Sequence, residues 1–261
     1  MYKILFFVFL SNIAFGQNRM FQTQNGNVKG AVTATTSSPV ISNGLVLNLD
    51  ASNTASYPGT GTNWTDLSGN GNNGTLINGV GYNALNGGSL VFNGISQGVS
   101  LLGASTLSVN QMTVSSWNYS ADYAQDGFMF EKTTNGQVNT QYSLFYNSNN
   151  LLYYRTVGLT PEDLTVNRIT AGVLNNQWNN VVATYDGSSK KIYVNGVLKA
   201  TINVTGTLVS NTTGASYIGI FGLFGGYPFN GKIAHTSVYN RALSDSEIQQ
   251  IFNATKAKYG L

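Results

Sequence analysis

The sequence predicts an all-β fold in which two antiparallel sheets pack face to face. From Trp178 to Val204, apolar and polar residues alternate in runs separated by Asn195-Gly196. Alternation with a period of two is typical of strands with one buried face, and Asn-Gly is typical of a type I′ hairpin turn. Many further short runs follow the same pattern, separated by glycine and asparagine. The 261 residues include no cysteine, so a buried core has to hold the fold together.

The first 43 residues do not carry the strand pattern. Residues 1–16 have one lysine, an apolar run over residues 4–10 and small residues at their end, which is typical of a secretory signal peptide. The alternative is a membrane anchor, but the run is far shorter than the ~20 residues that span a bilayer. Residues 17–43 are rich in Gln, Asn, Ser and Thr, which predicts a polar leader or linker, with an attachment arm as the alternative. We therefore expect a secreted protein, extracellular or periplasmic, with one domain over residues 44–261.

The strands can be placed in order along that domain. The first is expected over Leu45 to Asp50, and turn signals such as Asn73-Gly74 and Asn86-Gly87-Gly88 crowd the stretch that follows. Trp117 and Trp178 lie on strands that we expect to be buried. Many strands at this spacing predict a two-sheet sandwich or jelly roll. The further strands are expected at residues 89–92, 98–102, 112–119, 127–132, 141–146 and 151–157.

One short helix is expected at the C-terminal end. Residues 244–247, Ser-Asp-Ser-Glu, form a capping box, in which the first serine and the glutamate each satisfy a free backbone N–H. Leu243 and Ile248 flank it as a hydrophobic staple, and Ile251 and Phe252 extend the apolar stripe at helical spacing. We expect this helix to pack on an edge of the sandwich, with partner binding as the alternative.

Four stretches follow one another in an order that points to a known family. They are GLVLNLDAS (44–52), WTDLSGNGNNG (64–74), the run over 178–204 with its Tyr-Asp-Gly and Tyr-Val-Asn-Gly, and GKIAHTSVYNRALSDSEI (231–248). Together they resemble the laminin-G-like, concanavalin A-type jelly-roll domains of bacterial secreted proteins. The resemblance covers residues 44–259 and implies a jelly-roll fold and carbohydrate binding.

The acidic residues argue against glycoside hydrolysis. Sugar-cleaving domains of this architecture, the β-glucanases and laminarinases, carry closely spaced acids on one strand, and the retaining reaction needs two carboxyl groups ~5 Å apart. The glutamates here are Glu131, Glu162 and Glu247; none shares a strand face with another acid, and Glu162-Asp163 is expected in a turn. His235 is the single histidine, and no Gly-x-Ser-x-Gly elbow accompanies it. We therefore expect no catalytic residues and no enzyme activity.

Calcium is the one cofactor that the residues indicate, in a structural role. Asp66, Ser68 and Asn70 place oxygen ligands on alternate positions before a glycine, as in the first half of a calcium loop. Ile77 stands where a bidentate glutamate would fall, so Asp50 or backbone carbonyls would have to complete the site. The alternative is a turn held by the side-chain hydrogen bonds of these residues without metal.

Aromatic residues provide the expected ligand contacts. The chain has 15 tyrosines and many asparagines, which offer flat rings beside amide groups. Phe224 and Tyr227 belong to the glycine-rich stretch FGLFGGYPFNG, where we expect the rings at a loop tip, with a local plug as the alternative. Tyr153 and Arg155 form a second candidate ligand site.

The sequence therefore predicts a secreted, non-catalytic binding or adhesion module that recognises a glycan or a cell-surface ligand. Only 9% of the residues are charged and the net charge is +3 without a basic cluster, so no nucleic-acid partner is expected. No run after residue 16 could span a bilayer, and nothing in the sequence indicates an oligomeric state. The first alternative is a structural or decoration protein of a surface layer or virus particle, and the second is a glycoside hydrolase.

Overall fold

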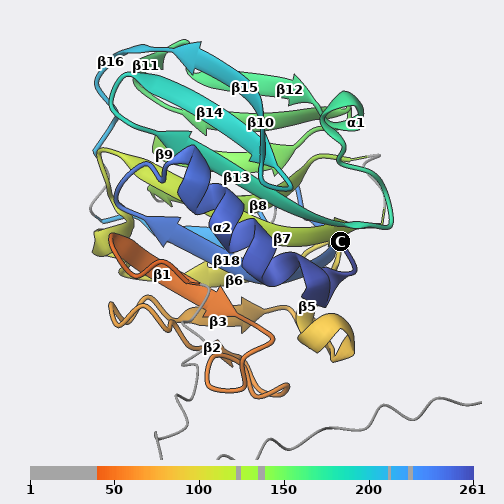
Figure 1. Ribbon diagram of the computed structural model, residues 1–261. Helices are drawn as coiled ribbons and strands as arrows, with labels where there is room; N and C mark the ends of the chain where they lie inside the picture. The colour runs from red at the N-terminus through yellow and green to blue at the C-terminus, as the bar shows by residue number, and fades with distance from the viewer. Residues whose placement is uncertain (1–39, 122–124, 135–138, 211–212, 223–225) are drawn as a thin grey trace, which may run out of the picture. The chain divides into compact units, whose positions relative to one another are not determined.

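Two antiparallel sheets face each other in the computed structural model, which describes residues 40–261 apart from 122–124, 135–138, 211–212 and 223–225 (Figure 1). The expected signal peptide and nearly all of the expected leader lie outside the described residues. None of the helices in the described part of the chain is long and apolar enough to cross a membrane.

The first sheet has eight strands. The order across it is β15 (Val197–Asn203), β14 (Ser189–Val194), β13 (Trp178–Tyr185), β7 (Met112–Ser120), β18 (Asn230–Tyr239), β5 (Ser89–Asn93) and β4 (Gly81–Asn83), and β1 (Leu45–Asp50) pairs with β18. Asn195 and Gly196 connect β14 to β15 with φ angles of 52° and 77°, as a type I′ turn requires. The predicted hairpin and first strand are therefore confirmed.

The second sheet also has eight strands. Their order is β12 (Asp163–Asn167), β10 (Leu151–Thr156), β9 (Asn139–Tyr146), β8 (Gly127–Thr134), β17 (Ser216–Ile218), β6 (Gly98–Leu101), β3 (Gly74–Ile77) and β2 (Asn63–Trp64). A short pair, β11 (Leu159–Thr160) and β16 (Thr205–Gly206), lies beside the two sheets, and the helical elements are α1 (Arg168–Ala171), η1 (Leu85–Gly87), η2 (Ser105–Leu107), α2 (Asp245–Thr255) and η3 (Lys256–Tyr259). This arrangement is the predicted jelly-roll sandwich with a short C-terminal helix.

The main core lies between the sheets and follows from strand alternation. Inward side chains of the first sheet, such as Val114 and Ile192, belong to one buried cluster with Leu144, Leu152 and Tyr154 of the second sheet. Because side chains alternate along a strand, the two residues that flank each inward residue point to the outward face. The outer face of the second sheet is therefore set by the core.

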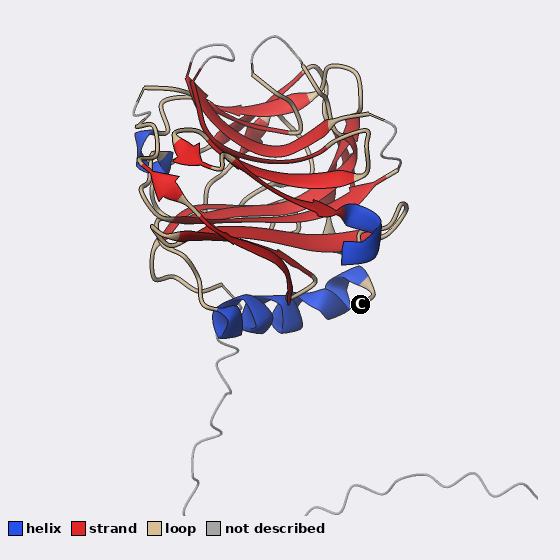
Figure 2. Ribbon diagram, turned by 90° about the horizontal axis from the view of Figure 1, so that it is seen from above, coloured by secondary structure: helices blue, strands red, loops and turns tan. Residues whose placement is uncertain are grey.

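The C-terminal helix covers a face of the first sheet rather than an edge of the sandwich, which corrects the expected position. Figure 2 shows α2 lying along that face. Trp117 of β7 is buried there, with its ring centroid 5.8 Å from that of Phe252 and 4.1 Å from that of Tyr259. Ile248 belongs to a neighbouring apolar cluster that includes Tyr193 of β14. The central strands carry large apolar side chains on both faces, so the outer face also has to be covered.

Both expected tryptophan burials are confirmed, since Trp117 is 1% exposed and Trp178 is 7% exposed. They lie beneath the helical C-terminal end and not between the sheets. The capping box is present as predicted: the Ser244 hydroxyl accepts from the Glu247 N–H, and the Glu247 carboxylate accepts from the Ser244 N–H at 2.8 Å.

Removing the tyrosine ring beneath η3 tests this packing. Tyr259 is 5% exposed and its ring also lies 4.9 Å from that of Trp178, so Tyr259→Ala leaves a cavity against two tryptophans. We expect a loss of about 3 kcal/mol in the free energy of unfolding, measured by urea denaturation. Leu261→Ala, at a residue that is 45% exposed, is the control and should be neutral. Equal midpoints for Tyr259→Ala and wild type would contradict the packing role of the C-terminal end.

Candidate functional site

Three of the predicted ligand residues, Tyr153, Arg155 and Tyr227, line one hollow of about 230 Å³ on the second sheet. The sequence presented them as two separate candidates. They meet because β10, β9, β8 and β17 are consecutive strands of the sheet, and Tyr227 lies in the segment after β17. Phe224 lies outside the described residues. We call this surface the aromatic hollow; its lining residues are Asp126, Phe128, Phe145, Asn147, Tyr153, Arg155, Phe221 and Tyr227.

Stacked rings form the floor of the aromatic hollow. Phe145 pairs with Phe128 on β8 and with Tyr153 on β10, so the three side chains stand in one row across the sheet. The Phe128 and Phe145 centroids are 4.5 Å apart with planes 5° apart, and those of Phe145 and Tyr153 are 4.8 Å and 12° apart. Phe128 is 4% exposed and Phe145 is 6% exposed. The faces of Phe128 and Phe145 cover one another, so these two rings form a rigid apolar floor. Contact with a ligand then falls to the other rings of the hollow.

Tyr227 stands at one side of this floor with its ring half exposed. Its ring lies 6.0 Å from that of Phe128 and 5.8 Å from that of Phe221, and its exposed fraction is 52%. The backbone of Tyr227 has a φ of 48°. The other non-glycine residues with positive φ in the described part of the chain are all asparagines. Holding an aromatic residue in this left-handed region costs about 1 kcal/mol of conformational free energy. The residue under this strain is also the one whose ring faces solvent.

Phe221 behaves differently from Tyr227 and folds back on the floor. Its ring centroid lies 4.8 Å from that of Phe128, and its N–H donates to the Gly226 carbonyl at 2.8 Å. Of the two residues for which the sequence predicts a loop tip or a local plug, Tyr227 is half exposed and Phe224 lies outside the described residues. Phe221, at the start of the same stretch, is the ring that packs back on the floor.

Arg155 forms the opposite side of the hollow and is paired with an acid. Its Nε and Nη2 both donate to the Asp163 carboxylate at 2.7 Å, and these hydrogen bonds raise the pKa of Arg155. The guanidinium carbon lies 5.7 Å from the Phe145 ring centroid. Asp163 belongs to β12, where it pairs directly with Arg155, so the turn expected at Glu162-Asp163 ends one residue earlier than predicted.

The polar rim is completed by Asn147 and Asp126. The side-chain oxygen Oδ1 of Asn147 accepts from the N–H groups of Asn149 and Leu151, and its side-chain amide Nδ2 donates to the Tyr153 hydroxyl at 3.3 Å. One oxygen of Asp126 accepts from the Ser148 N–H at 2.7 Å. These contacts fix a carboxylate and a phenol at the edge of the apolar floor.

Glu131 lies buried beneath the segment that carries Phe221. Its carboxyl oxygens accept from the Thr140 hydroxyl and from the Gly222 N–H, each at 3.0 Å. Burial raises the pKa of Glu131 to about 7, although both hydrogen bonds oppose that shift. The sequence indicated only that this glutamate lacks an acidic partner. Its link to the hollow depends on the distant Gly222, which no local pattern reveals.

The predicted calcium residue Asp66 is saturated by protein donors. One oxygen accepts from the N–H groups of Asn48 and Ser68 at 2.8 and 2.9 Å, and the other accepts from the Ser68 hydroxyl at 2.8 Å and the Asn72 N–H at 3.0 Å. These are the hydrogen bonds of the metal-free alternative. The N–H and O–H hydrogens point at the lone pairs that a cation would need, so the carboxylate does not fit a calcium ligand.

The other predicted metal residues are also engaged. Burial opposes ionisation of Asp50, but His235, Ser52 and Lys258 outweigh it and hold its pKa below the ordinary value. The Lys258 ammonium lies 3.6 Å from the Asp50 carboxylate, where it would repel a cation. The Asn70 amide nitrogen faces the Ser68 hydroxyl at 3.0 Å. Within the described ranges, no group of three or more His, Cys, Asp or Glu side chains could hold a metal ion.

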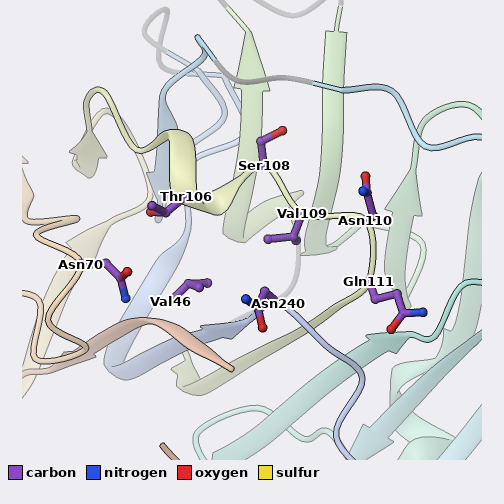
Figure 3. A pocket seen from close by; sticks show the side chains of 8 residues that line it. All are labelled: Val46, Asn70, Thr106, Ser108, Val109, Asn110, Gln111 and Asn240. Carbon is purple, nitrogen blue, oxygen red and sulfur yellow. The ribbon is translucent and has the colours of Figure 1, made fainter. Parts of the chain in front are cut away.

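A second, larger hollow of about 610 Å³ has an entirely different lining (Figure 3). Figure 3 shows amide and hydroxyl side chains around it and no aromatic ring. It therefore lacks a surface on which the apolar face of a sugar could stack. Its lining residues are Val46, Asn70, Thr106, Ser108, Val109, Asn110, Gln111 and Asn240.

Solved structures share the fold at low sequence identity. Domain 4 of AbnA, a GH43 extracellular arabinanase from Geobacillus stearothermophilus in complex with arabinotriose, has a TM-score of 0.61 and 20% identity over 79% of this chain and 97% of that one. The binding domain of botulinum neurotoxin DC in complex with SialylT has a TM-score of 0.60 and 16% identity, covering 82% of this chain. This protein spans about half (52%) of that toxin chain. Trypanosoma rangeli sialidase has a TM-score of 0.60 and 18% identity over 82% of this chain and 33% of its own.

No curated protein matches the sequence. A family model described as the concanavalin A-like lectin/glucanases superfamily matches residues 92–249, which is more than half of the chain. The model thus spans most strands of both sheets, including those that build the aromatic hollow. On this match and on the two-sheet architecture, the chain belongs to the concanavalin A-like lectin/glucanase superfamily.

Proposed function

We propose that this protein is a non-catalytic carbohydrate-binding module that holds its ligand in the aromatic hollow. The observation that carries the proposal is the meeting of Tyr227, Tyr153 and Arg155 around one apolar floor. The apolar face of a sugar packs on such rings, and its hydroxyl groups need donors and acceptors at the rim. The half-exposed Tyr227 supplies the ring, and Arg155 and Asp126 supply a donor and an acceptor.

The size of the hollow limits what it can hold. Its volume of about 230 Å³ is below the ~300–1,000 Å³ of pockets for drug-sized ligands. It therefore suits one sugar unit of a chain or a terminal residue, with the rest of the glycan in solvent. The likeness to domain 4 of the arabinanase and to the toxin binding domain supports a binding role for the fold.

The state of the glutamates supports binding without hydrolysis. Glu247 accepts two hydrogen bonds from Arg241 at 2.6 and 2.8 Å and caps α2. Glu131 is fully buried, and Glu162 lies exposed in the turn before β12. A retaining glycosidase needs an accessible pair of carboxyl groups ~5 Å apart. Each glutamate here has a structural role or stands at the surface outside the hollow lining.

We further propose that the protein is exported. The apolar run over residues 4–10 with its small following residues supports removal of a signal peptide. A glycan outside the cell is then an accessible ligand.

Binding can be tested with a glycan array followed by calorimetry on the strongest ligand. Tyr227→Ala and Tyr153→Ala should each weaken binding by about tenfold, since each removes a ring worth about 1 kcal/mol or more to the contact. Tyr119→Ala is the matched control, because Tyr119 is a half-buried tyrosine on β7 of the first sheet. Binding that survives both hollow variants, or that falls equally in the control, would rule out this site.

Calcium dependence can be tested by thermal melts with calcium and with a chelator. Because the Asp66 carboxylate already accepts four protein hydrogen bonds, we expect equal midpoints in the two buffers. Asp66→Ala should lower the midpoint in both, by several degrees for the loss of about 2 kcal/mol. A midpoint that rises with calcium in wild type and not in Asp66→Ala would restore the calcium site.

The stability of the protein should depend on pH through the buried Glu131. Its pKa is raised from 4.5 to about 7, so the protonated form favours the fold; this contribution is fully present below 4.5 and is lost as the pH rises through 7. Between about pH 5 and about pH 8, the midpoint temperature of unfolding should therefore fall by a few degrees more in wild type than in Glu131→Gln. Differential scanning calorimetry of both proteins measures the difference. Parallel curves would show that Glu131 does not titrate in this range.

A further inference from the structure

We propose that the aromatic hollow selects neutral glycans and discriminates against sugars that carry a carboxylate or sulfate group. The inference rests on the proposed carbohydrate binding and adds the class of ligand. It follows from the charges around the hollow. Arg155, the one arginine in the lining, already forms a salt bridge with Asp163 on the neighbouring strand β12.

Two charged side chains line the hollow, Asp126 and Arg155. Arg155 is held by Asp163 through two hydrogen bonds, and Asp126 has no salt bridge to any residue that the structure describes. Glu162, next to Asp163, adds a further negative charge close enough to act on Arg155. The acids around the hollow therefore outnumber its cation.

Lys190 is the next cation and does not serve the hollow. Its ammonium is fully buried and donates to the carbonyl oxygens of Pro161 and Glu162 at 3.0 and 2.6 Å and to the Thr156 hydroxyl at 3.1 Å. All three ammonium donors are thus used, two on the turn that precedes β12 and one on Thr156 at the end of β10. Its charge acts on Asp163 and Glu162, but its donors are used and it does not line the hollow. With Lys190 counted, three acids (Asp126, Glu162 and Asp163) still stand against two cations.

The pairing of Arg155 with Asp163 is built into the sheet. The two residues are directly opposite each other on β10 and β12, and the guanidinium also lies over the Phe145 ring. The planar fork of an arginine binds one carboxylate with two parallel N–H groups. An acidic sugar could take this Nε–Nη2 fork only by displacing Asp163. If it bound the remaining guanidinium N–H groups instead, it would share a single positive charge with Asp163, with Glu162 and Asp126 adding further negative charge.

A neutral sugar meets no such conflict. Arg155 keeps three of its five N–H donors beyond the two that bind Asp163. Asp126 donates nothing and accepts readily, so it suits a sugar hydroxyl. The rim therefore offers both a donor and an acceptor to hydroxyl groups while it repels an added negative charge.

The experiment compares matched ligands that differ by one charge. Oligosaccharides of galactose and of galacturonic acid with the same linkage and length serve as one pair, and an unsulfated and a sulfated galactan oligosaccharide as another, beside the array hits. Wild type should bind the neutral member of a pair at least about tenfold more tightly than the acidic one. Asp163→Asn releases Arg155 and should strengthen binding of the acidic member by about tenfold, with a smaller change for the neutral one.

Two further variants separate the mechanism from a general charge effect. In Asp163→Asn combined with Arg155→Leu, the gain for acidic ligands should disappear, since the released guanidinium is gone. Asp245→Asn makes the same charge change beside Lys191, at the start of α2, and should leave both ligands unaffected. The gain in Asp163→Asn should also shrink as salt is raised, because the new contact is between charges.

The outcomes distinguish this inference from the function on which it rests. Equal or tighter binding of the acidic member by wild type overturns the selectivity and leaves carbohydrate binding standing. An Asp163→Asn variant that folds and shows no gain for acidic ligands overturns the role given to the Arg155–Asp163 pair. If wild type binds no member of any pair and no glycan on the array, carbohydrate binding itself is overturned, and the selectivity with it.

Discussion

Alternate burial of side chains between the two sheets is the constraint on which the rest of the structure depends. Leu144 and Tyr146 of β9 face the core, so Phe145 between them has to face outward. The same alternation on β10 turns Tyr153 and Arg155 outward, because Leu152 and Tyr154 are buried. The strand-borne part of the hollow is thus determined by what the opposite face of each strand buries, and the segment after β17 adds Phe221 and Tyr227 to it.

Local patterns predicted the elements well, because the forces behind them act over a few residues. The Asn195-Gly196 turn and the capping box at Ser244 are of this kind. The aromatic hollow depends instead on strand order. Tyr153 on β10 and Tyr227 after β17 line the same hollow because the strands between them, β9 and β8, supply its floor. Phe145 carried no signal of its own, since an aromatic residue on an alternating strand is typical of a core. Asp163 could have been found, since it is the acid that pairs with Arg155 once β10 and β12 form a hairpin.

The chain uses few charges, and several of them lie in pairs. Among the described residues, Arg155, Arg241, Lys191 and Lys258 each form a salt bridge with an acid. Exposed pairs of this kind contribute little to stability, typically below about 1 kcal/mol. The low charged fraction, 9% of the residues, has the larger effect on the surface, because it leaves most of the polar groups there to amides and hydroxyls. A neutral polyhydroxylated partner is the natural match for such a surface.

The backbone of Tyr227 has a consequence for how this protein could change. Its left-handed conformation suits glycine or asparagine better than tyrosine, so either replacement would relax the chain locally. A population selected only for heat resistance would drift toward those residues and lose the ring, whereas one selected for the proposed ligand binding would retain it despite the strain. The identity of this single position across natural variants is therefore a record of which pressure has acted on the molecule.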